Sequence, residues 1–184
     1  MAMNEYLRKI AHLIVGLGIA GIIWFLPKAI TIPGIAISLL VGLGLIDLSL
    51  KKYYLPGISE LLALLEREGG FPGKGAFFFV FSALLVVILF PAPVASLAVA
   101  VLAVLDSVSA ICGRRFGNHR IRNGKSFEGF FAGFLVTAIV LAAFVSPGSA
   151  IVLALFAGIV ELVSPVDDNL VLPVLVALPL YFIL

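Results

Sequence analysis

Five carboxylates lie inside or directly beside long apolar runs of this sequence, where charged side chains are rare. A charge at the depth of a membrane costs several kcal/mol, so such residues usually face a cavity, pair with cations or bind a metal ion. They are therefore the first candidates for chemistry. These residues are Asp47, Asp106, Glu161, Asp167 and Asp168.

Asp106 begins a polar stripe along its apolar run. Ser109 and Gly113 follow at the i+3 and i+7 positions, which lie on one face of an α-helix. We expect this face to point into the interior of a helix bundle. The stripe leads directly into a segment rich in glycine and cations.

That segment, residues 113–129, also carries several hydroxyl and amide donors. Mg²⁺ takes one or two carboxylates plus phosphate oxygens, while arginine, lysine and exposed backbone N–H groups hold the remaining anionic charge. Carboxylates beside such a segment suit a polyphosphate–magnesium complex. For the arginine pair alone, anchoring to anionic headgroups is the better interpretation. The cations of the segment are Arg114, Arg115, Arg120, Arg122 and Lys125.

A second acidic segment, residues 164–169, follows the run that contains Glu161. Pro165 is expected to end a helix, so that Asp167–Asn169 form a loop that folds back near Glu161. Two adjacent carboxylates and an amide suit a divalent metal, although the same residues are common in solvated turns. Because Asp106 and the basic segment are expected on the same side, we favour the metal site.

Two single residues carry weaker signals. His12 lies one turn inside the first apolar run, where it is either an interfacial histidine bonded to a neighbour or a contact to a phosphate or hydroxyl group. Cys112 is the lone cysteine, which excludes an intrachain disulfide and a CxxC metal site. Its apolar flanks indicate a packing residue.

Two glycine motifs have structural explanations. Gly124-Lys-Ser126 ends like a P-loop, but six residues rather than four separate it from Gly117, and no strand precedes it. We therefore exclude a Walker A motif. Gly129 and Gly133 form a GxxxG pattern, which predicts close packing of two helices.

The composition indicates which elements must position these side chains. The chain is 62% hydrophobic and 12% charged, with a mean hydropathy of +1.25, unlike a soluble domain. We expect an all-α integral membrane protein in which residues 1–184 form one catalytic bundle. Prolines, glycines and charges delimit seven predicted spans, namely Ile10–Leu26, Ala29–Ser49, Ala76–Phe90, Val94–Cys112, Phe130–Val145, Ala150–Val163 and Leu170–Leu184.

The basic residues orient this arrangement. With a cytoplasmic N-terminus, eleven of the twelve Lys and Arg residues, Arg67 included, lie on the inner side and only Lys28 lies outside, as the positive-inside rule requires. All five candidate carboxylates then lie toward the cytoplasmic side of the cell membrane. The net charge of +2 is too small to favour nucleic acid as a partner.

The longest inner loop, residues 51–75, contains a short amphipathic stretch at Ile58–Leu65. This stretch predicts a helix that lies in the headgroup region. An interfacial linker is the simpler interpretation, and a lid or entry ramp for lipid is the alternative.

Taken in order, the motifs resemble the CTP-dependent lipid kinase family, which contains dolichol kinase, phytol kinase and yeast-type diacylglycerol kinase. The resemblance covers most of residues 8–173, with a departure at Leu105, where that family usually has glycine. The matching segments are Arg8-Lys9-Ile-Ala-His12, Gly73-Lys-Gly75 before a Phe-rich span, Asp106-Ser-Val-Ser-Ala-Ile-Cys-Gly-Arg-Arg-Phe-Gly117, Gly124-Lys-Ser-Phe-Glu-Gly129, and Glu161 with Asp167-Asp-Asn169 and Pro173.

The resemblance implies transfer of the γ-phosphoryl group of CTP to the hydroxyl of a membrane lipid alcohol. We expect Asp106 and Asp168 to hold Mg²⁺, with Asp167 or Glu161 completing its shell. Either Asp106 or Glu161 could also accept the proton of the lipid hydroxyl.

The resemblance carries functional roles over to Asp106, Lys125, Glu161, Asp168 and Asn169. We expect the neighbouring polar residues to bind the nucleotide. Arg114, Arg115 and Lys125 would clamp the phosphates, with Ser126 and Asn169 as nearby donors. Phosphoryl transfer depends mainly on positioning and on neutralising the charge of the transferred group, which suits this set of residues.

Two other functions compete with a kinase. A CDP-lipid synthase would use similar metal-binding and basic residues, although the Lys-Ser-Phe-Glu-Gly and Asp-Asp-Asn stretches resemble the kinases better. A small transporter would spread its carboxylates across the membrane depth and show inverted repeats, which this sequence does not. The lipid alcohol stays open, with a polyprenol or dolichol preferred, and so does the oligomeric state.

Overall fold

A computed structural model describes residues 2–65, 71, 73–121, 124–164 and 166–184. Arg67, Arg122 and Pro165, which contribute to the predictions above, lie outside the described residues. The described chain contains eight helices, which confirms the all-α class. They are α1 (Ala2–Phe25), α2 (Lys28–Leu50), α3 (Ile58–Leu65), α4 (Lys74–Leu89), α5 (Ala92–Phe116), α6 (Phe127–Ala142), α7 (Pro147–Val163) and α8 (Asp168–Ile183).

Each predicted span corresponds to one of these helices, and α3 coincides with the predicted amphipathic stretch. By length and composition, α1, α2 and α5 are apolar enough to cross a membrane, a pattern typical of multi-pass membrane proteins. The other four apolar helices have 16 or 17 residues, so each is about 25 Å long. The count of seven spans and the cytoplasmic N-terminus stay predictions.

Proline and serine residues separate the helices at the expected places. Pro27 precedes α2, and Pro91 lies between α4 and α5, because proline starts a helix readily but cannot continue one. Ser146 caps α7 by accepting a hydrogen bond from the Ser149 N–H group. The apolar runs are therefore interrupted at residues 91–93, at the junction of α4 and α5, and at residues 146–148, at the junction of α6 and α7.

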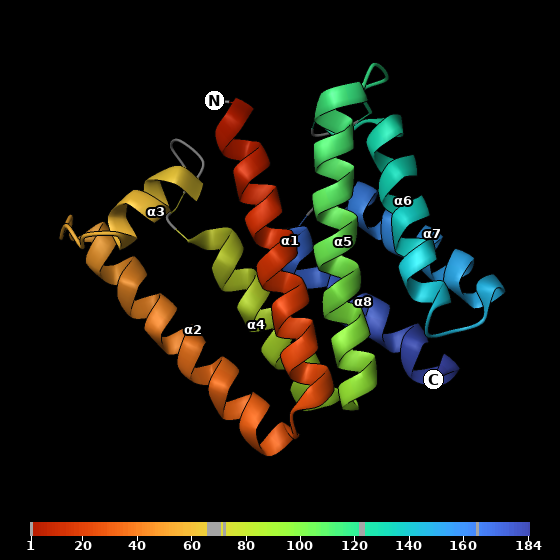
Figure 1. Ribbon diagram of the computed structural model, residues 1–184, viewed down its shortest axis with the longest axis horizontal. Helices are drawn as coiled ribbons and strands as arrows, with labels where there is room; N and C mark the ends of the chain where they lie inside the picture. The colour runs from red at the N-terminus through yellow and green to blue at the C-terminus, as the bar shows by residue number, and fades with distance from the viewer. Residues whose placement is uncertain (1, 66–70, 72, 122–123, 165) are drawn as a thin grey trace.

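The central helix of the bundle is α5, with α1 on one side and α6 on the other (Figure 1). Of the residues in its most apolar stretch, 83% are buried, compared with 11% in α2, which lies at the edge of the bundle.

Glycine residues allow neighbouring helices to approach one another closely. A Cβ atom on Gly129 would lie 2.5 Å from the Ser109 carbonyl oxygen, and one on Gly16 would lie 2.5 Å from the Ala103 Cβ. Gly129 thus packs against α5, as the GxxxG pattern predicts.

Candidate functional site

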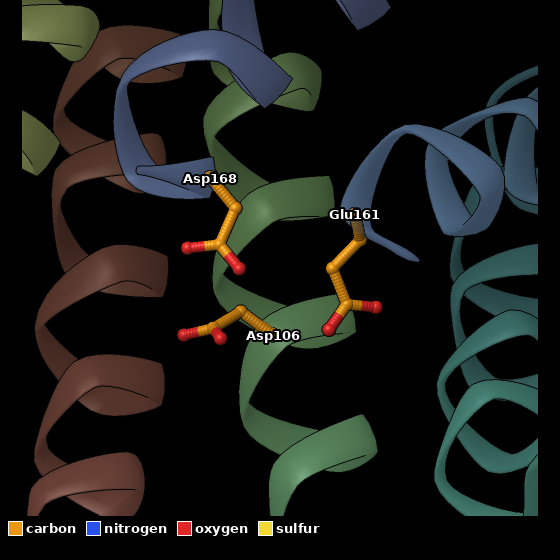
Figure 2. Close-up of side chains that lie close together, drawn as sticks. All are labelled: Asp106, Glu161 and Asp168. Carbon is orange, nitrogen blue, oxygen red and sulfur yellow. The ribbon is translucent and has the colours of Figure 1, made fainter. Parts of the chain in front are cut away.

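Three carboxylates converge from three helices (Figure 2). Asp106 comes from the middle of α5, Glu161 from near the end of α7 and Asp168 from the first residue of α8. One oxygen atom of each carboxylate lies within 4.8 Å of the other two. Asp106 and Glu161 are each only 5% exposed, so their charges need partners inside the protein.

Lys9, on α1, is the partner of Asp106. Its Nζ atom donates to both carboxylate oxygens, each at 2.6 Å, and the two side chains are 12% and 7% exposed. This pair connects residues that are 97 positions apart. It neutralises a charge that burial would otherwise make costly.

Lys125, between α5 and α6, serves the other two carboxylates. Its Nζ atom lies 3.2 Å from Glu161 Oε1 and 3.1 Å from Asp168 Oδ2, and it donates to the Glu161 carbonyl oxygen at 2.5 Å. Burial alone would lower the pKa of Lys125, but the attraction of Glu161 and Asp168 outweighs burial and raises that pKa. Lys125 is therefore a cation at neutral pH.

The polar stripe predicted on residues 106–113 faces this site. The Ser109 hydroxyl donates to Glu161 Oε1 at 2.8 Å. About one turn farther along α5, a Cβ atom on Gly113 would lie 2.9 Å from the Ser126 hydroxyl oxygen. The stripe thus brings the segment before α6 close to α5, which holds Lys125 beside the carboxylates.

Contacts of Arg120, Gly124 and Ser126 hold Lys125 at the site. Arg120 and Ser126 form an antiparallel bridge, and the Arg120 guanidinium donates to the Gly124 carbonyl oxygen at 2.8 Å. Gly124 has a φ of +76°, a conformation that glycine adopts without steric cost. Ser126 then caps α6 by accepting from the Gly129 N–H group at 3.2 Å.

Two buried polar atoms at the site have no hydrogen-bond partner in the described part of the chain. They are His12 Nε2, which lies 3.5 Å from Asp106 Oδ2, and Asn169 Oδ1. The His12 ring also packs edge-on against Phe79, with ring centroids 4.8 Å apart. Buried polar groups are rarely left unpaired, so both atoms are available to a ligand.

These residues line a pocket of about 950 Å³, which is large enough for a nucleotide-sized ligand. Its walls come from α1, α4, α5, α6, α7 and α8 and from the segments before α4, α6 and α8. Both cations and carboxylates line it, which suits a ligand that brings both phosphates and a metal ion. The cations are Arg8, Lys9, Lys74, Arg114, Arg120 and Lys125, and the carboxylates are Glu5, Asp106, Glu161, Asp167 and Asp168.

Most of the residues predicted from the sequence line this pocket, while Arg115 and Asp47 do not. The Arg115 guanidinium lies over the Phe116 ring, 5.6 Å from its centroid. Asp47 is 58% exposed and pairs with Lys51 along α2. The predicted residues that line the pocket are His12, Asp106, Arg114, Lys125, Ser126, Glu161, Asp167, Asp168 and Asn169.

The acidic segment differs from the predicted loop. Helix α8 begins at Asp168, and Asp167 caps it by accepting from the Asn169 N–H group at 3.3 Å. Capping engages the Asp167 carboxylate in the helix terminus, whereas Glu161 stands with Asp106 and Asp168. Of the two residues expected to complete a metal shell, Glu161 is the one in the cluster.

Sequence reasoning used Lys9 only for orientation and as part of a motif, and so missed its pairing with Asp106. One available signal was its spacing of three residues from His12, which places both side chains on one face of α1. Ser82, on α4, was also missed, and its hydroxyl donates to the Asn169 carbonyl oxygen at 2.7 Å. That bond connects α4 to the start of α8.

The three carboxylates fit a divalent cation. Mg²⁺ and Mn²⁺ favour hard oxygen ligands, and oxygens from α5, α7 and α8 lie close enough together to share one ion. The two lysines balance the same carboxylates in this structure. The donor set is therefore suited to a metal whose remaining ligands come from a phosphate-bearing substrate.

Comparison with known proteins gives two relatives. The chain is 37% identical over 180 residues to the uncharacterized protein MJ1137 of Methanocaldococcus jannaschii, and the matched region covers 95% of this chain and 92% of that protein. It is also 42% identical over 77 residues to the dolichol kinase sec59 of Schizosaccharomyces pombe, and this matched region covers 37% of this chain and 15% of the kinase. No protein-family model and no solved structure matches the chain. The second match supports part of the resemblance seen in the motifs, and the first shows that the chain belongs to the family of MJ1137.

Proposed function

We propose that this protein is a membrane-embedded lipid kinase that transfers the γ-phosphoryl group of CTP to the hydroxyl of a membrane lipid alcohol. A polyprenol or dolichol is the preferred acceptor. The observation that carries the proposal is the convergence of Asp106, Glu161 and Asp168 with two lysines at one pocket. The partial similarity to a dolichol kinase supports the same class of reaction.

Asp106, Glu161 and Asp168 would hold Mg²⁺. When bound, the ion would neutralise charge on the phosphates of the nucleotide. The chain's own contribution is to present these carboxylates from three different helices at one point, so that the metal site forms only when the bundle is assembled. The burial of Asp106 and Glu161 also limits the access of water, which would otherwise compete with the lipid hydroxyl for the phosphoryl group.

The cations of the pocket would position the nucleotide. Lys125 reaches the carboxylate cluster from the segment before α6, while Arg114 and Arg120 line the pocket from earlier positions of the same segment. Guanidinium groups bind phosphate oxygens in a bidentate manner, and an ammonium group acts as a point charge. Together these side chains would orient the chain of phosphates toward Asp106, with Ser126 and Asn169 nearby.

Transfer requires the hydroxyl oxygen of the lipid to attack the γ-phosphorus. A new P–O bond forms, the bond to the bridging oxygen of CTP breaks, and CDP leaves with that oxygen. The hydroxyl proton passes to a carboxylate, either Asp106 or Glu161. His12, whose Nε2 atom has no hydrogen-bond partner among the described residues, would contact the hydroxyl or the phosphoryl group beside Asp106.

The proposal includes a topology. Seven spans with a cytoplasmic N-terminus would place the pocket at the inner face, where CTP arrives from the cytosol and the alcohol arrives sideways through the bilayer. The concentration of the buried carboxylates in one cluster supports an enzyme over a transporter, since relay sites would be distributed along the transport path.

Labelled CTP tests the proposal. Purified protein in lipid is given Mg²⁺ and CTP labelled in the γ position, or ATP labelled likewise, with a polyprenol, phytol or diacylglycerol. Label that enters the organic phase from CTP supports the kinase and identifies its acceptor. Pyrophosphate release in the presence of a lipid phosphate, without transfer of label to any alcohol, would instead assign the protein to the CDP-lipid synthases.

A further inference from the structure

A second pocket, of about 260 Å³, lies between α1, α2 and α4. Its walls are mainly branched apolar side chains, among them Ile19 and Ile22 of α1 and Ile35 of α2. We call it the apolar groove. In Figure 1, α1 and α2 meet at one end of the bundle and diverge toward the end that holds α3.

The apolar groove adjoins the polar pocket. Val80, on α4, lines both of them. On α1, Val15 lines the polar pocket and Ile19, one turn farther along, lines the groove. From His12 to Leu26, which also borders the groove, α1 rises about 21 Å, so the combined path reaches from the carboxylate cluster across much of an apolar layer.

Two hydroxyl side chains line the groove, and both already donate their protons to backbone carbonyl oxygens. The Thr31 hydroxyl donates to the Pro27 carbonyl oxygen at 2.9 Å, and the Ser38 hydroxyl donates to the Gly34 carbonyl oxygen at 2.9 Å. Both hydroxyls are therefore satisfied within α2. A hydrocarbon chain is the class of ligand that such a surface accommodates.

Gly34 keeps part of the groove wall open. A Cβ atom at this position would meet no other atom within 4 Å. The residue lies inside α2 and borders the groove, although glycine is unfavourable in a helix interior. A larger side chain at position 34 would therefore occupy space at the groove wall.

We propose that the apolar groove binds the hydrocarbon chain of the acceptor alcohol while its hydroxyl reaches His12 and Asp106. This inference rests on the proposed lipid kinase function. The groove meets the polar pocket beside Val80 and has a volume of about 260 Å³, so it has room for one hydrocarbon chain whose head group lies in the polar pocket. It therefore selects a single-chain isoprenoid alcohol over diacylglycerol, which brings two chains.

The first test fills the groove. Gly34→Leu should lower kcat/KM for a long polyprenol by about tenfold, the effect of removing roughly two methylene groups from an apolar site. Turnover of a five-carbon alcohol, which occupies only the polar pocket, should not change. Gly42→Leu is the matched control, because a Cβ atom there also meets nothing within 4 Å and the residue does not line the groove.

The second test needs no catalysis. In a Cys112→Ser background, Ser38→Cys places a thiol beside the groove, and Ile37→Cys places one on α2 outside the groove; both positions are exposed, so they differ in groove contact and not in general accessibility. Polyprenol should slow modification of the thiol at position 38 by a membrane-soluble maleimide and leave position 37 unaffected. Equal protection at both positions would mean that bulk lipid covers α2 and would overturn the proposal.

The outcomes separate the groove from the kinase. Protection at position 38 without phosphoryl transfer by the wild-type protein supports the groove and rejects the kinase. Transfer to polyprenol that is insensitive to Gly34→Leu, with no protection at position 38, rejects the groove alone. Protection by diacylglycerol as strong as that by polyprenol overturns the selection for a single chain.

Discussion

Lys9 Nζ lies 2.6 Å from both carboxylate oxygens of Asp106, and this pair joins the start of α1 to the middle of the central helix. Both side chains are nearly buried. The pair therefore stabilises the packing of α1 against α5, and it also neutralises a carboxylate of the site. Mutations can separate these two effects.

Lys9→Met should destabilise the bundle by about 3–5 kcal/mol, because removing one partner leaves a buried carboxylate without its cation. Chemical unfolding in mild detergent measures this change. Lys51→Met is the control, since Lys51 and Asp47 form an exposed pair and such pairs contribute at most about 1 kcal/mol. The double variant Lys9→Met with Asp106→Leu should recover most of the lost stability, and a failure to recover would argue against the pair as the cause.

Asp168→Asn should abolish Mg²⁺-dependent turnover while the bundle stays folded. The amide keeps the shape of the side chain and removes the charge that a divalent ion needs. Binding of Mn²⁺, followed by electron paramagnetic resonance, gives a readout that does not depend on turnover. Asp47→Asn, on an exposed part of α2, should change neither property. Retention of most activity and of Mn²⁺ affinity by Asp168→Asn would remove this residue from the metal site.

Glu161→Gln and Asp167→Asn should have different effects. Glu161 belongs to the carboxylate cluster and should be needed for metal binding, whereas the Asp167 carboxylate caps α8. Loss of that cap should cost about 1 kcal/mol of stability, with Mn²⁺ affinity changed far less than in Glu161→Gln. The same resonance titration, with thermal unfolding alongside, compares the two. The reverse order of metal affinities would contradict the assignment.

Lys125→Ala should raise the KM for CTP or lower kcat, because it removes the cation proposed to bind the phosphates of the nucleotide beside Glu161 and Asp168. Initial rates at varied CTP and fixed alcohol measure both constants. Lys28→Ala, at the far end of the bundle and outside the pocket, is the control. Unchanged nucleotide kinetics would mean that the basic segment does not bind the nucleotide and serves as a membrane anchor.

Arg114→Ala should impair nucleotide kinetics more than Arg115→Ala. Arg114 lines the pocket, and Arg115 lies over the Phe116 ring outside it. The two substitutions remove the same charge from adjacent positions of one helix, so a general loss of positive potential would affect both equally. Equal effects of the two variants on KM for CTP would therefore point to that general cause.

Gly129→Ala should destabilise the protein by about 1–3 kcal/mol, the usual cost of overpacking. The added Cβ atom would lie 2.5 Å from the Ser109 carbonyl oxygen and 2.9 Å from the Gly113 Cα, and backbone atoms do not move aside easily. Thermal unfolding in detergent tests this expectation. Gly148→Ala, where the new atom meets nothing within 4 Å, should be nearly neutral.

The class of fold and most of the helix boundaries could be predicted from the amino-acid sequence. Apolar runs, prolines and the GxxxG pattern act over neighbouring positions, so they can be read without knowledge of the rest of the chain. The same is true of the amphipathic stretch that became α3, and of the unusual carboxylates Asp106 and Glu161, because burial of a charge has a cost wherever the helices pack.

Tertiary structure decided which of those residues meet. The rotation of each helix about its axis depends on packing between segments distant in the chain, and one residue changes the direction of a side chain by about 100°. That rotation turned Lys9 toward Asp106, placed Glu161 rather than Asp167 in the cluster and turned Arg115 away from the pocket. The apolar groove beside Gly34 likewise exists only because three helices enclose it, and composition alone does not distinguish its lining from lipid-facing residues.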